Sequence, residues 1–331
     1  MADLYPLLMQ PVFDPRPWGT TDLSPIYPAH RFDEKIGEAW LTGDHCKVSN
    51  GPLKGKTLAE LSAQHGAELV GEAARDPHRF PLLLKFLFPH EKLSVQVHPD
   101  DKAAQAVGQP WGKTECWYVA HARPGAQIAL GLKPGVSSEE FGRSIRENRA
   151  EDLLNWVNVY PGEMIYVAAG TVHTLGPGSI IVETQQQSDT TYRLYDYGRP
   201  RELHLEHGLA AVKEEVASGK TVRPAPSALN GSKNRRAPLI AAPYFTVDMF
   251  DLKEPQDFPA RAGKRSVEIL TAVEGCAVIE AEGSTPVTLA KGDAVVVPAS
   301  VGAFRVKPQW TVEFLKSSVP GSPPPEPETR L

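Results

Sequence analysis

The chain has 331 residues, 41% of them hydrophobic and 23% charged, proportions typical of a globular protein with about two domains. The formal net charge is −5 and no Lys/Arg-rich run occurs, which argues against a nucleic acid or an anionic membrane as partner. No apolar run approaches the roughly 20 residues that span a bilayer, and three scattered cysteines predict no disulfide framework.

The chain begins without the basic, apolar and small-residue regions of a secretory signal, so we expect a cytoplasmic protein, probable partners being small molecules rather than an obligate protein partner. Thr57 and Glu60 have the spacing of a capping box at the start of the first expected helix. Short β-rich stretches between Gly/Pro turns fill most of the remainder, as in a β-sandwich or barrel. Three stretches predict helices: 57–75, 137–156 and 202–217. The proline-rich residues 319–331 predict a disordered tail.

The sequence contains an internal repeat. The segment 162–173 (GEMIYVAAGTVH) aligns with 292–303 (GDAVVVPASVGA) at an offset of 130. An earlier pair of segments, which sets Gly125 against Gly275, aligns at an offset of 150. The difference of 20 residues equals the length of the helical stretch 137–156. One duplicated β-barrel, with a helix inserted into its first copy, explains both offsets.

The spacing of glycine, five residues, Pro or Ala, four residues and histidine resembles a signature of the cupin barrels. His173 keeps the histidine in the first copy, whereas Ala303 and Arg265 occupy the positions that match His173 and Glu115 in the second. We therefore expect a mainly β protein of two cupin-type (jelly-roll) barrels with a few inserted helices. The expected domains are a catalytic barrel at 1–235 and a metal-free barrel at 236–318.

Four residues of the first half are candidate metal ligands. Gln96 and His98 alternate along a strand, so both side chains leave the same face. Glu115 opens another expected strand, and His173 follows the turn described above. Two imidazoles, a carboxylate and an amide oxygen suit a borderline divalent ion such as zinc, and the lack of a thiolate favours a catalytic site.

The chain resembles the type I phosphomannose isomerases, specifically the short bacterial class, over roughly residues 5–316. The matching motifs are PRPWGTTDL, IGEAWLTGD, KFLFPHEKLSVQVHPDD, GKTECWYV, GTVHTLGPG and VETQQQSDTTYRLYDYGR. The resemblance implies a cupin metalloenzyme, with one Zn²⁺ per chain, that interconverts mannose 6-phosphate and fructose 6-phosphate. Its zinc ligands fall on Gln96, His98, Glu115 and His173.

The same resemblance places the catalytic arginine at Arg193 and a lysine beside the site at Lys113. Glu183 and Asp189 match acidic residues that face the substrate pocket, and Lys85 is a further substrate-binding candidate. The longer members have His-Lys-Pro-Glu where this chain has GKTE at 112–115, so a base role for that histidine cannot operate here.

Aldose–ketose isomerisation moves a proton between C1 and C2 through a cis-enediol(ate), which requires an electrophile and a base. Arg193 could stabilise the enediolate or hold the phosphate, and the base is Lys113, Glu183 or Asp189. The candidate phosphate donors are Lys85, Lys113, Arg193 and Arg199.

Two alternatives remain open at this point. The ligands His98, Glu115 and His173 would also suit a cupin oxygenase that binds iron. A sugar-phosphate-binding module without catalysis would keep the same residues. The chain has neither a P-loop nor a dinucleotide fingerprint, which argues against ATP- or NAD-dependent chemistry.

Overall fold

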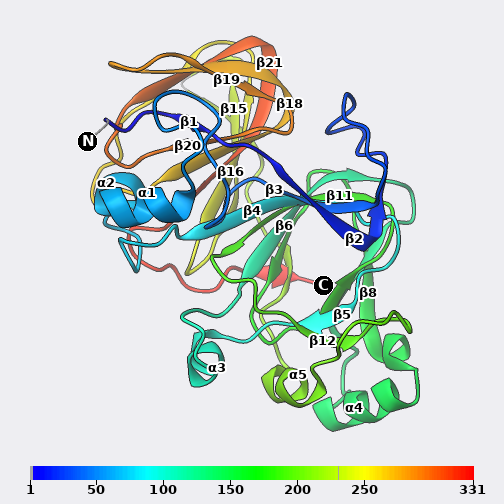
Figure 1. Ribbon diagram of the computed structural model, residues 1–331. Helices are drawn as coiled ribbons and strands as arrows, with labels where there is room; N and C mark the ends of the chain where they lie inside the picture. The colour runs from blue at the N-terminus through cyan, green and yellow to red at the C-terminus, as the bar shows by residue number, and fades with distance from the viewer. Residues whose placement is uncertain (1–2, 230) are drawn as a thin grey trace.

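The computed structural model describes residues 3–229 and 231–331, and β-strands dominate these ranges (Figure 1). The mainly β fold class is therefore confirmed. The strands form three sheets, two of which are built almost entirely from the first 221 residues. No helix in the described ranges is both long enough and apolar enough to cross a membrane.

Two sheets face each other in the N-terminal part of the chain. Their inner faces share one apolar cluster, in which Trp117 and Ile165 of the larger sheet join Ile128 and Leu175 of the smaller. In spatial order, the larger sheet contains β2 (Val12–Thr20), β3 (Ile36–Trp40), β4 (Leu82–Leu87), β11 (Ser179–Gln186), β6 (Glu115–Ala122), β9 (Met164–Val167), β13 (Gly219–Thr221) and β22 (Thr329–Arg330). The smaller sheet contains β12 (Tyr192–Tyr195), β5 (Val95–Val97), β10 (His173–Leu175), β7 (Gln127–Leu132) and β8 (Leu154–Asn158).

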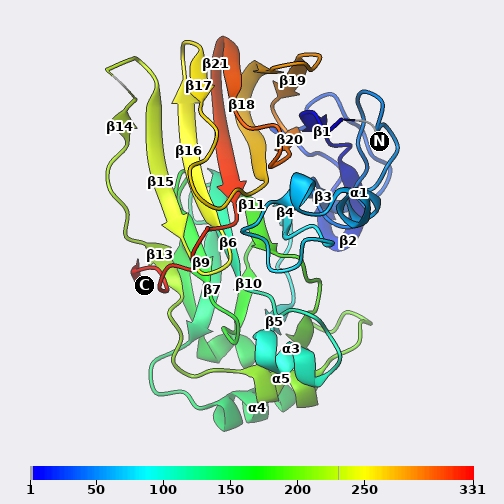
Figure 2. The same cartoon turned by 90° about the vertical axis from the view of Figure 1, so that its left-hand side faces the viewer.

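The third sheet belongs mainly to the C-terminal part and lies above the first two in Figure 2. Its core is a second apolar cluster, which includes Phe250, Leu270 and Phe314. The main path of this sheet is β1 (Leu7–Leu8), β20 (Ala294–Val297), β18 (Glu268–Ala281), β21 (Phe304–Ser318), β16 (Thr246–Leu252), β15 (Arg235–Ala241) and β14 (Ser227–Ala228). Two further strands, β17 (Gln256–Phe258) and β19 (Val287–Ala290), pair with β21 and β18.

Both chain ends cross to the other part of the molecule. Leu7 pairs with Val296, so β1 extends the C-terminal sheet. At the other end, Arg330 pairs with Lys220, so β22 extends an N-terminal sheet. The structure thus differs from the prediction of a disordered tail at 319–331. The edge strand β13 offers unpaired backbone groups, and the tail covers them although it has little apolar surface of its own.

The helices are shorter than the sequence predicts. They are α1 (Leu58–His65), α2 (Ala67–Val70), α3 (Asp101–Ala106), α4 (Ser138–Arg146), the 3₁₀ helix η1 (Ala150–Leu153) and α5 (Leu205–Ala211). Gly66, with φ of +53°, separates α1 from α2 inside the predicted 57–75 helix. The end of the predicted 137–156 helix forms β8, because Leu154 and Trp156 pair with β7. Tertiary pairing overrides the helical spacing there.

The predicted capping box at the start of α1 is present. The Thr57 hydroxyl accepts a hydrogen bond from the Glu60 amide at 3.1 Å, and the Glu60 carboxylate accepts one from the Thr57 amide at 2.8 Å. Thr57→Ala should therefore lower the free energy of unfolding by about 1 kcal/mol, measured by urea denaturation. Thr57→Ser keeps the acceptor and serves as the control. Equal stability of the alanine variant and the wild type would contradict a stabilising role for this cap.

The two aligned repeats have the same local structure. Strands β9 and β20 occupy residues exactly 130 apart in their segments, each preceded by a glycine with positive φ, Gly162 at +85° and Gly292 at +88°. Gly125 and Gly275 likewise have φ of +83° and +75°. These matched turns support the predicted duplication.

Candidate active site

Three neighbouring strands of the smaller N-terminal sheet place Arg193, Gln96 and His173 in one row. Gln96 of β5 is opposite His173 of β10 on one side and opposite Arg193 of β12 on the other. Residues directly opposite each other in adjacent strands project from the same face. Glu115 opens β6 in the facing sheet and therefore approaches from the other side.

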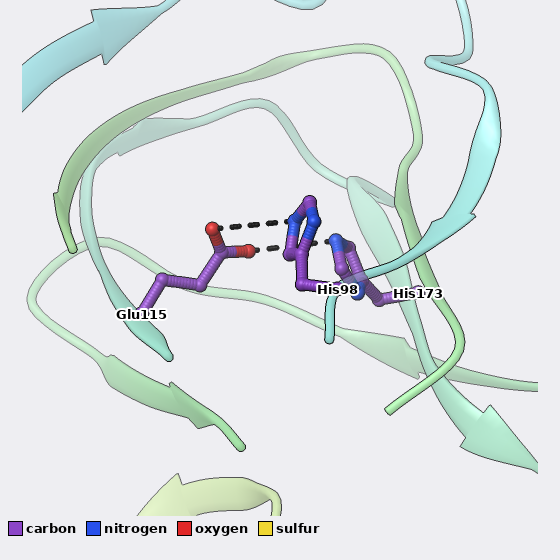
Figure 3. A group of neighbouring side chains, drawn as sticks. All are labelled: His98, Glu115 and His173. Atoms are coloured by element: carbon purple, nitrogen blue, oxygen red, sulfur yellow. Dashed lines mark ion pairs between the residues drawn. The ribbon is translucent and has the colours of Figure 1, made fainter. Parts of the chain in front are cut away.

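His98, Glu115 and His173 bring their ligand atoms together in a buried cluster (Figure 3). The Glu115 carboxylate oxygens lie 3.6 Å from Nε2 of His98 and 3.4 Å from Nε2 of His173. All the ligand atoms of the three residues lie within 4.8 Å of one another. The fourth predicted ligand, Gln96, is adjacent, with its amide nitrogen 3.1 Å from Nε2 of His173.

Hydrogen bonds at the far side of each ring orient the two imidazoles. Nδ1 of His98 donates to the Thr190 carbonyl at 3.0 Å, and Nδ1 of His173 donates to the Thr171 carbonyl at 2.9 Å. With the proton on Nδ1, the Nε2 lone pair of each ring faces the Glu115 carboxylate.

The donor set fits a divalent metal ion. Nε2 of His98 and Oε1 of Glu115 are buried and have no hydrogen-bond partner among the described residues. Burial lowers the pKa of His98 well below its ordinary value and that of His173 to about 4, so both rings are neutral at pH 7. Burial also raises the pKa of Glu115 to about 8. Lone pairs that converge without a proton between them are what a cation requires.

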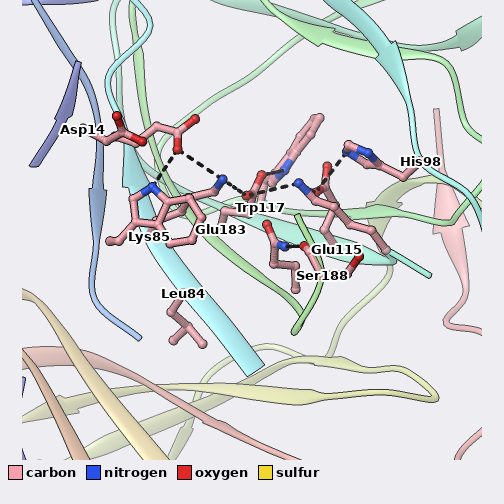
Figure 4. Close-up of polar contacts among 12 residues, drawn as sticks. Asp14, Leu84, Lys85, His98, Glu115, Trp117, Glu183 and Ser188 are labelled. Atoms are coloured by element: carbon pink, nitrogen blue, oxygen red, sulfur yellow. Dashed lines mark hydrogen bonds and ion pairs between the residues drawn. The ribbon is translucent and has the colours of Figure 1, made fainter. Parts of the chain in front are cut away.

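A chain of alternating charges continues from this cluster into the pocket (Figure 4). Lys113 lies 3.2 Å from Glu115 and 3.9 Å from Glu183. Lys85 then joins Glu183, at 3.3 Å, to Glu38, at 3.4 Å. All five side chains are buried. The alternation lets each buried charge face an opposite one, which offsets the cost of removing it from water.

The protonation states within this chain follow from its pairing. Burial opposes ionisation of Glu183, but Lys85 and Lys113 keep its pKa below the ordinary value. Trp117 adds a hydrogen bond from Nε1 to Glu183 at 3.0 Å. Burial would lower the pKa of Lys85, yet Glu38 and Glu183 raise it above its ordinary value. Lys85 is therefore a fixed cation.

Glu38 supplies a stability test that does not involve the metal cluster. Burial opposes its charge, but Lys85 and Arg16 lower its pKa to about 2, from an ordinary 4.5. Its stabilising contribution is therefore complete above about pH 4.5 and is lost as the pH falls through 2. Glu38→Gln should lower the free energy of unfolding at pH 7 by about 3 kcal/mol.

Urea unfolding at a series of pH values measures this effect, and the stabilities of the two proteins should converge as the pH falls from 4.5 towards 2. Glu139→Gln, at an exposed carboxylate paired with Arg143 on α4, is the control and should cost only a few tenths of a kcal/mol. A gap between wild type and Glu38→Gln that is independent of pH would contradict the assignment.

A cavity of about 500 Å³ lies beside the cluster, lined by Gln96, Lys113 and Glu183 among others. Three further predicted residues, Lys85, Asp189 and Arg193, also line it. The sequence predictions thus converge on a single pocket, although they come from segments up to about 110 residues apart.

The arginines around this cavity differ in their pairing. Arg193 donates from Nη1 to the Glu202 carbonyl at 2.8 Å, while its buried Nε has no partner among the described residues. Burial and the nearby Arg201 lower the pKa of Arg193. Arg199, a predicted phosphate donor, does not line the cavity; it pairs with Asp196 at 3.2 Å and with a second carboxylate. Arg193 is therefore the better placed of the two for an anion.

Three residues that line the cavity were assigned no role from the sequence: Arg16, Glu38 and Arg201. Glu38 had a detectable signal, because it is the one charged residue in the otherwise uncharged strand IGEAW, all of which is buried. Arg16 lies in the motif PRPWGT, which was matched without a role. Arg201 gave no signal, since its place depends on its fork onto Asp196 at 2.6 and 2.7 Å.

Comparison with known proteins supports the resemblance independently. "Phosphomannose isomerase type I, catalytic domain" matches residues 9–132, and "mannose-6-phosphate isomerase, cupin domain" matches residues 237–315. The chain is 35% identical to mannose-6-phosphate isomerase ManA of Bacillus subtilis over 318 residues, covering 91% of this chain and 96% of that protein. It is 34% identical to the mannose-6-phosphate isomerase of Streptococcus mutans, covering 91% and 94%.

Solved structures agree with these matches. The crystal structure of the mannose 6-phosphate isomerase from Bacillus subtilis superimposes with a TM-score of 0.84 at 33% identity, covering 94% of this chain and 99% of that one. A phosphomannose isomerase structure from Salmonella typhimurium, at 18% identity and a TM-score of 0.75, shares the fold. The identity over nearly the whole of both chains shows that this protein belongs to the type I mannose-6-phosphate isomerase family.

Proposed function

We propose that this protein interconverts mannose 6-phosphate and fructose 6-phosphate through a cis-enediol(ate) and that it uses one zinc ion per chain. The observation that carries the proposal is the convergence of His98, Glu115 and His173 beside a cavity of about 500 Å³. That volume lies in the usual range for small-molecule sites. The relatives named mannose-6-phosphate isomerase supply the substrate.

The metal would be held by His98, Glu115, His173 and the Gln96 amide, after that amide turns its oxygen inward. When bound, it supplies a Lewis acid for the sugar oxygens. The two backbone carbonyls that accept from Nδ1 of the histidines keep both rings in the ligating orientation. Trp117 packs edge-on against His173, with ring centroids 5.4 Å apart, and helps to exclude water.

The other residues of the cavity bind the substrate and transfer its proton. Arg193 stabilises the enediolate or holds the phosphate, because its guanidinium faces the cavity with a free Nε. Lys85, a fixed cation, contributes positive charge to substrate binding. Lys113 is the group nearest the ligands, and we assign it the proton transfer, with Glu183 and Asp189 as the neighbouring carboxylates.

We also propose that the two halves are duplicated cupin barrels and that the second, around 236–318, serves without a metal. Ala303 and Arg265 stand where the first copy has His173 and Glu115, and Arg265 instead pairs with Glu72 at 2.8 Å on the surface. A cytoplasmic location is part of the same proposal, since its sugar-phosphate substrates are metabolites of that compartment.

Metal removal tests the function directly. A coupled assay of mannose 6-phosphate conversion should show turnover that disappears on chelation and returns with zinc. In deuterated solvent, deuterium should enter the product at C1 or C2, because the transferred proton exchanges with solvent at the base. Complete retention of substrate hydrogen would indicate a hydride shift instead.

The alternatives give different results in the same experiment. No turnover in a folded, zinc-loaded sample would contradict the isomerase, and tight sugar-phosphate binding in that sample would favour the binding module. Oxygen consumption with ferrous iron would favour the oxygenase.

A further inference from the structure

Asp101, the first residue of α3, connects four groups from distant parts of the chain. Its Oδ1 accepts hydrogen bonds from the Gly112 amide at 2.9 Å and from the Gln186 side chain at 3.1 Å. Its Oδ2 accepts from Arg75 at 2.5 Å and from the Tyr244 hydroxyl at 3.2 Å. Each oxygen therefore has two donors, which fills the accepting capacity of the carboxylate.

These bonds hold the backbone that carries Lys113. The amides of Gly112, Lys113 and Thr114 each have a partner: the Asp101 carboxylate, the Pro99 carbonyl at 3.0 Å and the Gln186 side-chain oxygen at 2.9 Å. Three successive amides are thus fixed immediately before the ligand at position 115. Gln186 joins the two halves of this arrangement, since it accepts from one amide and donates to Asp101.

The segment also rests directly on the chain below it. A Cβ at Gly112 would lie 2.4 Å from the backbone carbon of Asp100, so no larger residue fits without moving the segment. Neighbouring groups keep Asp101 ionised: burial opposes the charge, but the Gly112 amide and Arg75 hold its pKa below the ordinary value.

Tyr244 comes from the other half of the molecule. It lies in the turn between β15 and β16, within the residues matched by the cupin-domain description. Burial, with a further contribution from Asp101, raises the pKa of Tyr244 to about 12, so its hydroxyl is a donor at pH 7. Arg75 lies over the Tyr244 ring, 5.9 Å from its centroid.

We propose that Asp101 is a positioning residue for Lys113 and Glu115, and that Tyr244 makes the C-terminal cupin domain part of this positioning. The proposal rests on the isomerase function proposed above. It gives the C-terminal domain a task in the active site of the other domain. Neither Asp101 nor Tyr244 lines the cavity beside the metal cluster, so both act through the 112–115 segment.

Steady-state kinetics of Tyr244→Phe and Asp101→Asn test the proposal. Tyr244→Phe removes only the hydroxyl and should lower kcat about threefold to tenfold, with KM changing less and metal content unchanged. Asp101→Asn leaves one acceptor and adds a donor where four donors converge, and should lower kcat up to about 100-fold. Tyr5→Phe is the matched control, because its hydroxyl also makes two hydrogen bonds, to Asn50 and from Leu53, far from the site.

Amide hydrogen exchange gives a readout that does not depend on activity. Both variants should speed exchange in the peptide that contains 112–115 by about tenfold or more, whereas Tyr5→Phe should not. If exchange in that peptide and kcat both match the Tyr5→Phe control, the positioning proposal is wrong. If the wild type has no isomerase turnover but the exchange still changes, the proposed function fails and the structural coupling of Asp101 to the segment stands.

Discussion

Replacing His173 by alanine is expected to remove the bound metal and to lower isomerase turnover by at least about a thousandfold. The variant loses one of two imidazoles whose Nε2 lone pairs face the Glu115 carboxylate. It also loses the Nδ1 bond to Thr171 that orients the ring. Metal content of the purified protein, measured by elemental analysis beside the coupled assay, checks both effects.

His65→Ala is the matched control for this experiment. His65 is also buried, but it lies on α1 and outside the cavity beside the metal cluster. We expect this variant to lose some stability while it keeps the metal and the turnover. A His173→Ala protein that retained one metal ion per chain would show that the metal binds elsewhere.

Arg193→Ala should lower kcat by about 100- to 1000-fold while the metal content stays near that of the wild type. The guanidinium faces the cavity from the strand next to Gln96 and is not a ligand, so its loss removes charge stabilisation only. Arg193→Lys should restore little of the activity, because an ammonium cannot reproduce the planar fork of donors.

Arg199→Ala provides the comparison for Arg193. Its guanidinium is held by Asp196 and Glu91 outside the cavity, so its removal should affect stability more than turnover. Loss of metal from Arg193→Ala would mean that Arg193 has a structural role. Equal losses of kcat in Arg193→Ala and Arg199→Ala would contradict the distinction that the structure draws between the two arginines.

Much of the metal cluster was predictable because it depends on local patterns. The alternation of Gln96 and His98 follows from the two-residue period of a strand, and the position of His173 follows from a turn with fixed spacing. Glu115 was expected at the start of a strand and does open β6. Family motifs then linked these segments, which explains why the cluster could be anticipated without a structure.

The charge chain behind the cluster was not predictable in the same way. Lys85 and Glu183 face each other only because β4 and β11 pair in one register. Their ion pair, and the one between Lys85 and Glu38, depend on strand neighbours that the sequence does not specify. The sequence therefore suggested Lys85 as a substrate contact, without its two carboxylate partners.

The helix boundaries failed for a related reason. Apolar spacing at 137–156 indicated one continuous helix, but Leu154 and Trp156 gain more from pairing beside β7 than from a last helical turn. Likewise, the tail at 319–331 has too little apolar surface to predict order, and its place is set by the open edge of β13.

The single row formed by Arg193, Gln96 and His173 limits which insertions and deletions this protein can tolerate. One residue gained or lost within β5 would turn Gln96 and His98 to the opposite face of the sheet and separate them from their neighbours on both flanking strands. The loops that join these strands carry no such requirement. We therefore expect length variation among descendants of this gene to accumulate in the connections, while β5, although only three residues long, keeps its length.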